Sequence, residues 1–84
     1  MRIIVVFENR TSTLLFSRDL RALHIPSMIV NTPRGIATSC GISVELDERF
    51  LKTVYALVTK NKYTLFKGVY RVVRYSMGTR YIKL

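Results

Sequence analysis

The residue best suited to chemistry in this chain is Cys40, its only cysteine. It stands in a loop-forming stretch, residues 31–41, between two apolar runs. Arg34 lies six positions earlier and brings a fixed positive charge, which favours the nucleophilic thiolate form of a thiol. Ser39 and Gly41 flank the cysteine and leave room for hydroxyl and backbone N–H donors near the sulfur. These residue types fit a loop that presents a reactive thiol.

The presence of a single cysteine limits the thiol reactions that are possible within one chain. No disulfide can form within the chain, and a Cys-x-x-Cys redox pair is excluded. The remaining possibilities use one sulfur or none. The alternative interpretation of Cys40 is a small buried hydrophobic residue that leads into the next strand, since free cysteines are often buried and inert.

Other residues give weak signals for catalysis or metal binding. The only histidine, His24, falls near the end of a predicted helix, where a structural role is favoured. Ser39 has no candidate base nearby, and Asp47 and Glu48 are typical of a helix start. The glycines form no phosphate-binding pattern, and ligand clusters with close spacing are missing. We therefore expect neither a cofactor nor a metal.

The charge is unevenly distributed along the chain. Residues 1–48 carry five Arg and five acidic residues, whereas residues 49–84 carry nine Lys or Arg and no acid, which accounts for the net charge of +9. Such asymmetry predicts an acidic partner, although a solvated basic face is the simpler alternative. The candidate anion-binding residues are Lys60, Lys62, Lys67, Arg71, Arg74 and Arg80.

Aromatic residues alternate with these cations, which is typical of surfaces that stack and neutralise single-stranded nucleic acid. They are Tyr63, Phe66, Tyr70, Tyr75 and Tyr81. No RNA-binding signature accompanies them, and Tyr is also a common edge-strand residue. A small nucleic-acid or anionic-partner binding module is therefore the alternative function, and a weak one.

Hydrophobic patterning predicts an α+β fold. The expected elements are strands over 3–7, 28–30, 42–46 and 69–73, and helices from about 9–12 to 23 and over 48–60. The order β-α-β-β-α-β predicts a ferredoxin-like sandwich, with an antiparallel four-stranded sheet and two helices on one face. In this fold the Cys40 loop joins the second and third strands at a sheet edge, so we expect it to be exposed.

The chain of 84 residues is long enough for one domain. We expect a ferredoxin-like core over 1–75 and a basic C-terminal extension over 76–84, which either turns at Gly78 into a short extra strand or stays mobile. No stretch approaches the roughly 20 apolar residues of a membrane helix. The single cysteine and the lack of an export signal predict a cytoplasmic protein, and open sheet edges make a homodimer plausible.

The stretch Thr32-Pro33-Arg34-Gly-Ile-Ala-Thr-Ser39-Cys40-Gly41, followed by the strand 42–46, resembles the putative selenium/sulfur carrier protein-like family of small bacterial proteins. The likeness extends over residues 2–73 and includes the His24-Ile25-Pro26 turn and the segment 68–71. Residues 74–84 lie beyond it.

This resemblance implies a carrier or accessory protein rather than an enzyme with its own turnover. Cys40 would accept sulfur or selenium from a donor protein, as a persulfide or selenosulfide, and pass it to an acceptor. The resemblance also implies that Arg34 stabilises the anion, that Pro33 and Ser39 shape the loop, and that Gly41 lets donors approach the sulfur.

Overall fold

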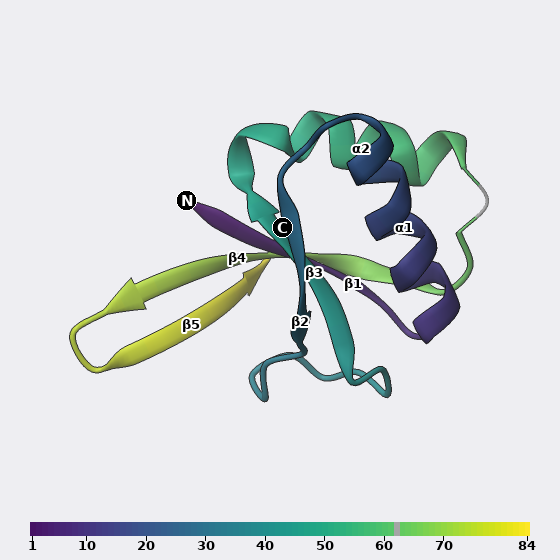
Figure 1. The fold of residues 1–84 in the computed structure, drawn as a ribbon. Helices are drawn as coiled ribbons and strands as arrows, with labels where there is room; N and C mark the ends of the chain where they lie inside the picture. The colour runs from purple at the N-terminus through teal and green to yellow at the C-terminus, as the bar shows by residue number, and fades with distance from the viewer. Residues whose placement is uncertain (62) are drawn as a thin grey trace.

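The computed structural model describes residues 1–61 and 63–84. Five strands and three helical segments follow one another along the chain (Figure 1). They are β1 (Arg2–Phe7), α1 (Arg10–Ala22), β2 (Ser27–Asn31), β3 (Ile42–Asp47), the 3-10 helix η1 (Glu48–Phe50), α2 (Leu51–Lys60), β4 (Phe66–Tyr75) and β5 (Gly78–Lys83). Every strand and helix predicted from the sequence is present.

The ends of the helices follow from local hydrogen bonding. Asn9 caps α1, because its side chain accepts a hydrogen bond of 2.7 Å from the backbone N–H of Ser12. Beyond the helix, His24 has a left-handed φ of 58°, and its N–H donates to the carbonyl of Arg21. Asp47 caps η1 by accepting from Arg49 N at 2.8 Å. His24 and Asp47 thus end and begin helices.

The sheet has the order β2-β3-β1-β4-β5, and all its neighbouring strands are antiparallel. The prediction of four strands was wrong, because β5 pairs with β4 and places Tyr81 opposite Val72. The turn before β5 ends at Gly78, whose φ of 153° is disfavoured for other residues. The segment 76–84, predicted as a C-terminal extension, therefore forms this turn and the fifth strand.

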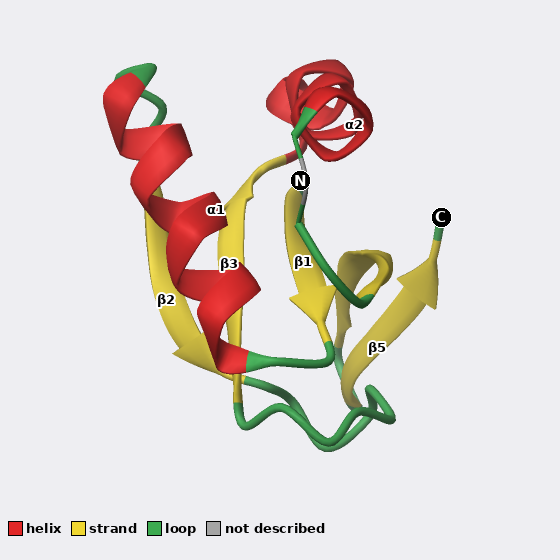
Figure 2. Ribbon diagram, turned by 90° about the vertical axis from the view of Figure 1, so that its right-hand side faces the viewer, coloured by secondary structure: helices red, strands yellow, loops and turns green. Residues whose placement is uncertain are grey.

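Both helices pack on one face of the sheet (Figure 2). The core on this face joins alternate residues of β1 to Phe16 and Leu20 of α1 and to Val54 of α2. Phe7 lies at the centre of an aromatic cluster, with ring centroids 5.4–5.6 Å from those of Phe16, Tyr63 and Phe66. In the described part of the chain, no helix is long and apolar enough to cross a membrane.

The opposite face of the sheet carries a second, smaller core, to which the long connection between β2 and β3 contributes. Ile36 from this connection packs with Ile4 and Val6 of β1, and Tyr81 of β5 lies against the same cluster. The loop does not extend freely from a sheet edge, so the expectation of an exposed Cys40 was wrong: only 7% of Cys40 is exposed. Burying Ile36 draws the loop onto the sheet.

The position of Phe16 predicts a large loss of stability on truncation. Replacing Phe16 with Ala should lower the free energy of unfolding by about 3–5 kcal/mol, because the cavity would lie beneath α1. The matched control is Leu15→Ala on the same helix, at a residue that is 36% exposed, and should cost less than about 1 kcal/mol. Urea denaturation measures both values, and equal losses would contradict this description of the core.

Candidate functional site

The segment 32–41 contains no strand or helix and is closed at its base by hydrogen bonds. Thr32 N donates to the carbonyl of Gly41 at 2.9 Å, and the hydroxyls of Thr32 and Ser43 lie 2.6 Å apart. A turn follows, in which Ile36 N donates to the carbonyl of Pro33 at 3.0 Å. Pro33 is the first residue of this turn.

Cys40 lies at the end of this loop against the start of α1. Its Sγ donates to the backbone carbonyl of Ile42 at 3.2 Å and lies 3.8 Å from Thr13 Oγ1. The Thr13 hydroxyl itself donates to the carbonyl of Asn9 at 2.9 Å. The sulfur is therefore a buried thiol with polar neighbours, and Thr13 is a neighbour that the sequence analysis missed.

Glu8, the residue after β1, holds the loop in place beside Cys40. Its carboxylate accepts from Thr38 Oγ1 at 2.5 Å and from Ser39 Oγ at 3.3 Å, and Thr38 Oγ1 in turn accepts from Cys40 N at 3.2 Å. The hydrogen bond from Thr38, with help from the charge of Lys67, holds the pKa of Glu8 below its ordinary value. We call Glu8, Thr38 and Ser39 the loop latch. Nothing in the sequence pattern marked Glu8 as part of the site.

A hollow of about 420 Å³ opens on the surface of the loop. Its lining consists entirely of loop residues: Thr32, Pro33, Arg34, Ile36, Ala37, Thr38, Ser39, Cys40 and Gly41. One added sulfur or selenium atom on Cys40 is far smaller than this space. Cys40 is therefore one of the residues that line a hollow in the surface of the loop.

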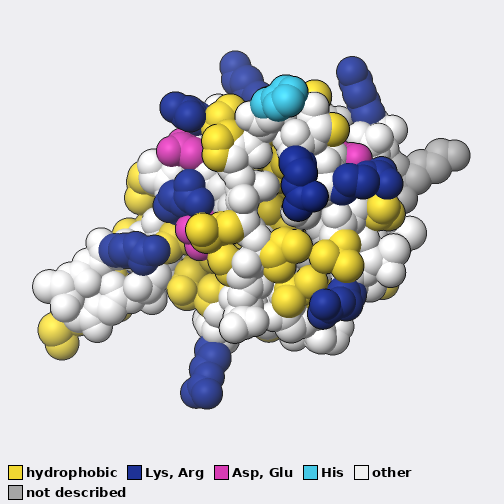
Figure 3. Space-filling view, in the orientation of Figure 1, with side chains coloured by type: hydrophobic (Ala, Val, Ile, Leu, Met, Phe, Trp, Pro, Cys, Tyr) yellow, Lys and Arg dark blue, Asp and Glu magenta, His cyan; other side chains and the backbone are white. Residues whose placement is uncertain are grey.

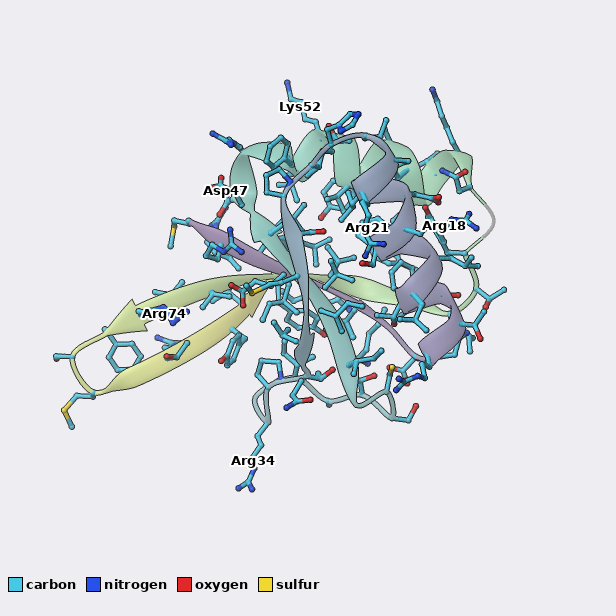
Figure 4. The ribbon with its side chains drawn as sticks, in the orientation of Figure 1. Arg18, Arg21, Arg34, Asp47, Lys52 and Arg74 are labelled. Carbon is cyan, nitrogen blue, oxygen red and sulfur yellow. The ribbon has the colours of Figure 1, made fainter. Side chains whose placement is uncertain are left out.

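Arg34 does not lie where the sequence analysis expected it. Its side chain extends from the tip of the loop, away from the body of the protein (Figure 4). Gly41 also lacks the predicted close contacts, because a Cβ at this position would meet no atom within 4 Å. By contrast, a Cβ at Gly35 would lie 2.8 Å from Tyr81 Cδ2, so the loop passes directly over this ring.

The predicted cations do not form one patch. Arg71 makes a two-bond ion pair with Glu48 at 2.8 and 2.6 Å, which raises the pKa of Arg71 and lowers that of Glu48. Lys60 ends α2, Lys67 is in β4, and Arg74 and Arg80 lie on the β4–β5 hairpin. Lys62 lies outside the described residues. Figure 3 shows Lys and Arg scattered over the visible face.

The aromatic residues are equally dispersed. Tyr63 and Phe66 pack against Phe7. Burial, together with the hydrogen bond that the Tyr63 hydroxyl donates to Asp19, raises the pKa of Tyr63. Tyr70 is buried. These rings form no common stacking surface for nucleotide bases. Nor does the described chain gather three His, Cys, Asp or Glu residues into a metal-binding group.

Weakening the loop latch should expose the backbone of Cys40. In Glu8→Gln the charged acceptor is lost, so the amide of Cys40 should exchange with solvent several-fold faster than in the wild-type protein. The control is Glu45→Gln, which removes a carboxylate that pairs with Arg2 at 3.0 Å. Hydrogen exchange followed by NMR at one pH tests this, and equal effects of the two variants would rule out the latch.

The loop latch should also depend on pH. The pKa of Glu8 is lowered in the folded state, so its contribution is complete above the ordinary value of 4.5 and is lost as the pH falls through the lowered pKa. The amide NMR signals of residues 38–40 should titrate with a midpoint below 4.5. A midpoint at or above that value, or an unchanged titration in Glu8→Gln, would contradict this role.

A comparison with known protein families gives a match over most of the chain. The family model described as "Putative Se/S carrier protein-like" matches residues 2–71 of the chain. The matched region contains the whole loop, Cys40 and the loop latch, and ends within β4. No curated protein and no solved structure matches the chain significantly. This chain belongs to the putative Se/S carrier protein-like family.

Proposed function

We propose that this protein carries sulfur or selenium on Cys40 between a donor protein and an acceptor protein. The observation that carries the proposal is the position of the only cysteine. Cys40 lines the loop hollow of a chain that a carrier family model matches over residues 2–71. A carrier needs one nucleophilic sulfur and no second cysteine, since a neighbouring thiol would attack the persulfide and release its cargo.

Transfer to Cys40 balances without an oxidant. The Cys40 thiolate attacks the outer sulfur of a donor persulfide, and a new S–S bond forms as the donor's S–S bond breaks. The donor leaves as a thiolate and takes up the proton that Cys40 gave up. In the second transfer a nucleophile of the acceptor attacks the terminal sulfur, and the Cys40 thiolate departs. The same steps apply to selenium bound as a selenosulfide.

The burial of the thiol means that loading requires the loop to open. The loop latch is the natural point of opening, because it consists of side-chain hydrogen bonds to Glu8 rather than a strand ladder. When the loop closes again, Cys40 would return to its buried position, which would shield the bound sulfur atom from water and from other thiols. In this cycle the closed loop protects the bound sulfur atom, and the open loop allows it to be exchanged with a partner.

Thr13 is well placed to assist ionisation of the sulfur. Its hydroxyl donates to Asn9 O, and its oxygen lies 3.8 Å from Sγ. When Cys40 loses its proton, the Thr13 hydroxyl can turn from the Asn9 carbonyl to the sulfur. We assign this role to Thr13 in place of Arg34, whose side chain points away (Figure 4).

Three finer features complete the proposal. The order β2-β3-β1-β4, with two helices on one face, supports a ferredoxin-like assignment for the part before β5. A lone free thiol suits a reducing compartment, so we propose a cytoplasmic location. The partners are a sulfur or selenium donor and an acceptor enzyme, and the chain itself is a carrier without turnover.

Sulfur loading can be measured directly. After incubation with a cysteine desulfurase and free cysteine, the intact protein should gain the mass of one sulfur atom, and Cys40→Ser should gain none. Thr13→Val should load about fivefold more slowly, as expected for the loss of a hydrogen bond of about 1 kcal/mol. Thr11→Val, an exposed position on the same helix, is the control. Failure of the wild-type protein to load from both the desulfurase and inorganic polysulfide would disprove the carrier function.

A further inference from the structure

The strand pairing brings a group of cations to the end of the molecule that bears Cys40. Phe7 pairs with Phe66, and the register shift between Val6 and Phe7 leaves Lys67 as the extra residue of β4 at this end. Lys83 reaches the same region, since a Cβ at Gly68 would lie 2.8 Å from Lys83 Cε. Arg10 begins α1 directly after its cap, and Arg34 projects from the loop. We call Arg10, Arg34, Lys67 and Lys83 the loop-end cations.

Acidic residues are distributed in the opposite way. Glu8 is the one acid at the loop end, and its oxygens accept hydrogen bonds from Thr38 and Ser39. Glu45, Asp47 and Glu48 lie near the far end of β3. The remaining acid, Asp19 of α1, accepts hydrogen bonds from Arg18 and Tyr63. The surface around Cys40 is therefore positively charged.

A carrier exchanges sulfur only when the two sulfur atoms come into contact, so the surface around Cys40 must face the partner. We propose that the protein that exchanges sulfur with Cys40 docks on the loop-end cations through an acidic surface. This inference rests on the proposed carrier function. Complementary charge of this kind steers encounter and raises the association rate.

A nucleic acid fits this surface less well than a protein does. Single-stranded nucleic acids need exposed aromatic rings on which bases stack. At the loop end, Phe7 and Tyr70 are buried and Tyr81 lies beneath Gly35. The more exposed tyrosines are Tyr55 in α2 and Tyr75 at the far end of β4, which are 39% and 49% exposed. The loop end thus offers charge without stacking.

The potential at Cys40 can be tested with two small disulfides of opposite charge. Dithiobis(nitrobenzoate) carries two carboxylates, and cystamine carries two ammonium groups. In each case the Cys40 thiolate attacks the S–S bond, a mixed disulfide forms and a probe thiolate leaves. Both reactions wait for the same loop opening, so the ratio of their rates reports the local potential. The ratio of the rate with the anionic probe to the rate with cystamine should be roughly three- to tenfold higher for Cys40 than for N-acetylcysteine at low salt.

Charge reversal provides the matched comparison. Arg34→Glu should lower this ratio several-fold, whereas Lys52→Glu, at the opposite end of the molecule, should leave it unchanged (Figure 4). Sulfur loading from the desulfurase should likewise be slower in Arg34→Glu and unchanged in Lys52→Glu. Added salt should lower the loading rate of the wild-type protein until it approaches the rate of Arg34→Glu.

The outcomes distinguish the two proposals. If Cys40 accepts sulfur at rates that ignore salt and both charge reversals, the acidic docking surface is wrong and the carrier function stands. If neither disulfide reacts and no sulfur is loaded, both proposals fail. If the wild-type protein binds a single-stranded RNA tightly and Arg34→Glu abolishes this binding, the partner is a nucleic acid and the inference is overturned.

Discussion

The burial of β1 on both faces is the constraint on which the rest of the structure depends. Residues 3–7 are all buried, and they alternate between the core beneath the helices and the core beneath the loop. The first core holds α1 and α2 on the sheet, and the second draws Ile36 and its loop onto the opposite face. At the end of the same strand, Glu8 turns outward to bind Thr38 and Ser39. One strand thus sets the position of the helices and of the cysteine loop.

The site combines a buried sulfur with a loop that is held beside it by side-chain hydrogen bonds. Cys40 donates to a backbone carbonyl and is almost fully buried, which suits storage of a reactive atom but not its exchange. The β2–β3 ladder closes the base of this loop, and side-chain hydrogen bonds to Glu8 hold Thr38 and Ser39. Loops held in this way open locally at a lower free energy than the strands beside them. A carrier with this arrangement would separate holding its cargo from passing it on.

The sequence was sufficient for those parts of the fold that depend on local patterns. The apolar run 3–7, the helix start expected within residues 9–12, and the helix-start residues Asp47 and Glu48 predicted the positions of β1, α1 and η1–α2. The loop cysteine and the family likeness also followed from sequence alone. The fifth strand was left as one of two alternatives, because a short polar hairpin such as 76–84 is stabilised by pairing with β4 rather than by its own pattern.

The contacts of the site could not be predicted in the same way. Arg34 is close to Cys40 in sequence, but the turn that begins at Pro33 carries its side chain outward, whereas Ile36 supplies the buried anchor. Glu8 and Thr13 are more than 25 residues from Cys40, and only the folding of the loop onto the sheet brings them near it. The contacts of Cys40 with Thr13 of α1 and with the carbonyl of Ile42 accompany the burial of a thiol that was expected to be exposed.

The contact between Gly35 and Tyr81 has a consequence for how the chain is built. Tyr81 belongs to β5, beyond the region that the family model covers, yet its ring supports the loop from below. The Tyr81 ring therefore limits how closely the loop can approach the sheet at Gly35. A substitution at position 81 would therefore alter the support of the loop that carries Cys40, while every residue that touches the sulfur remained the same.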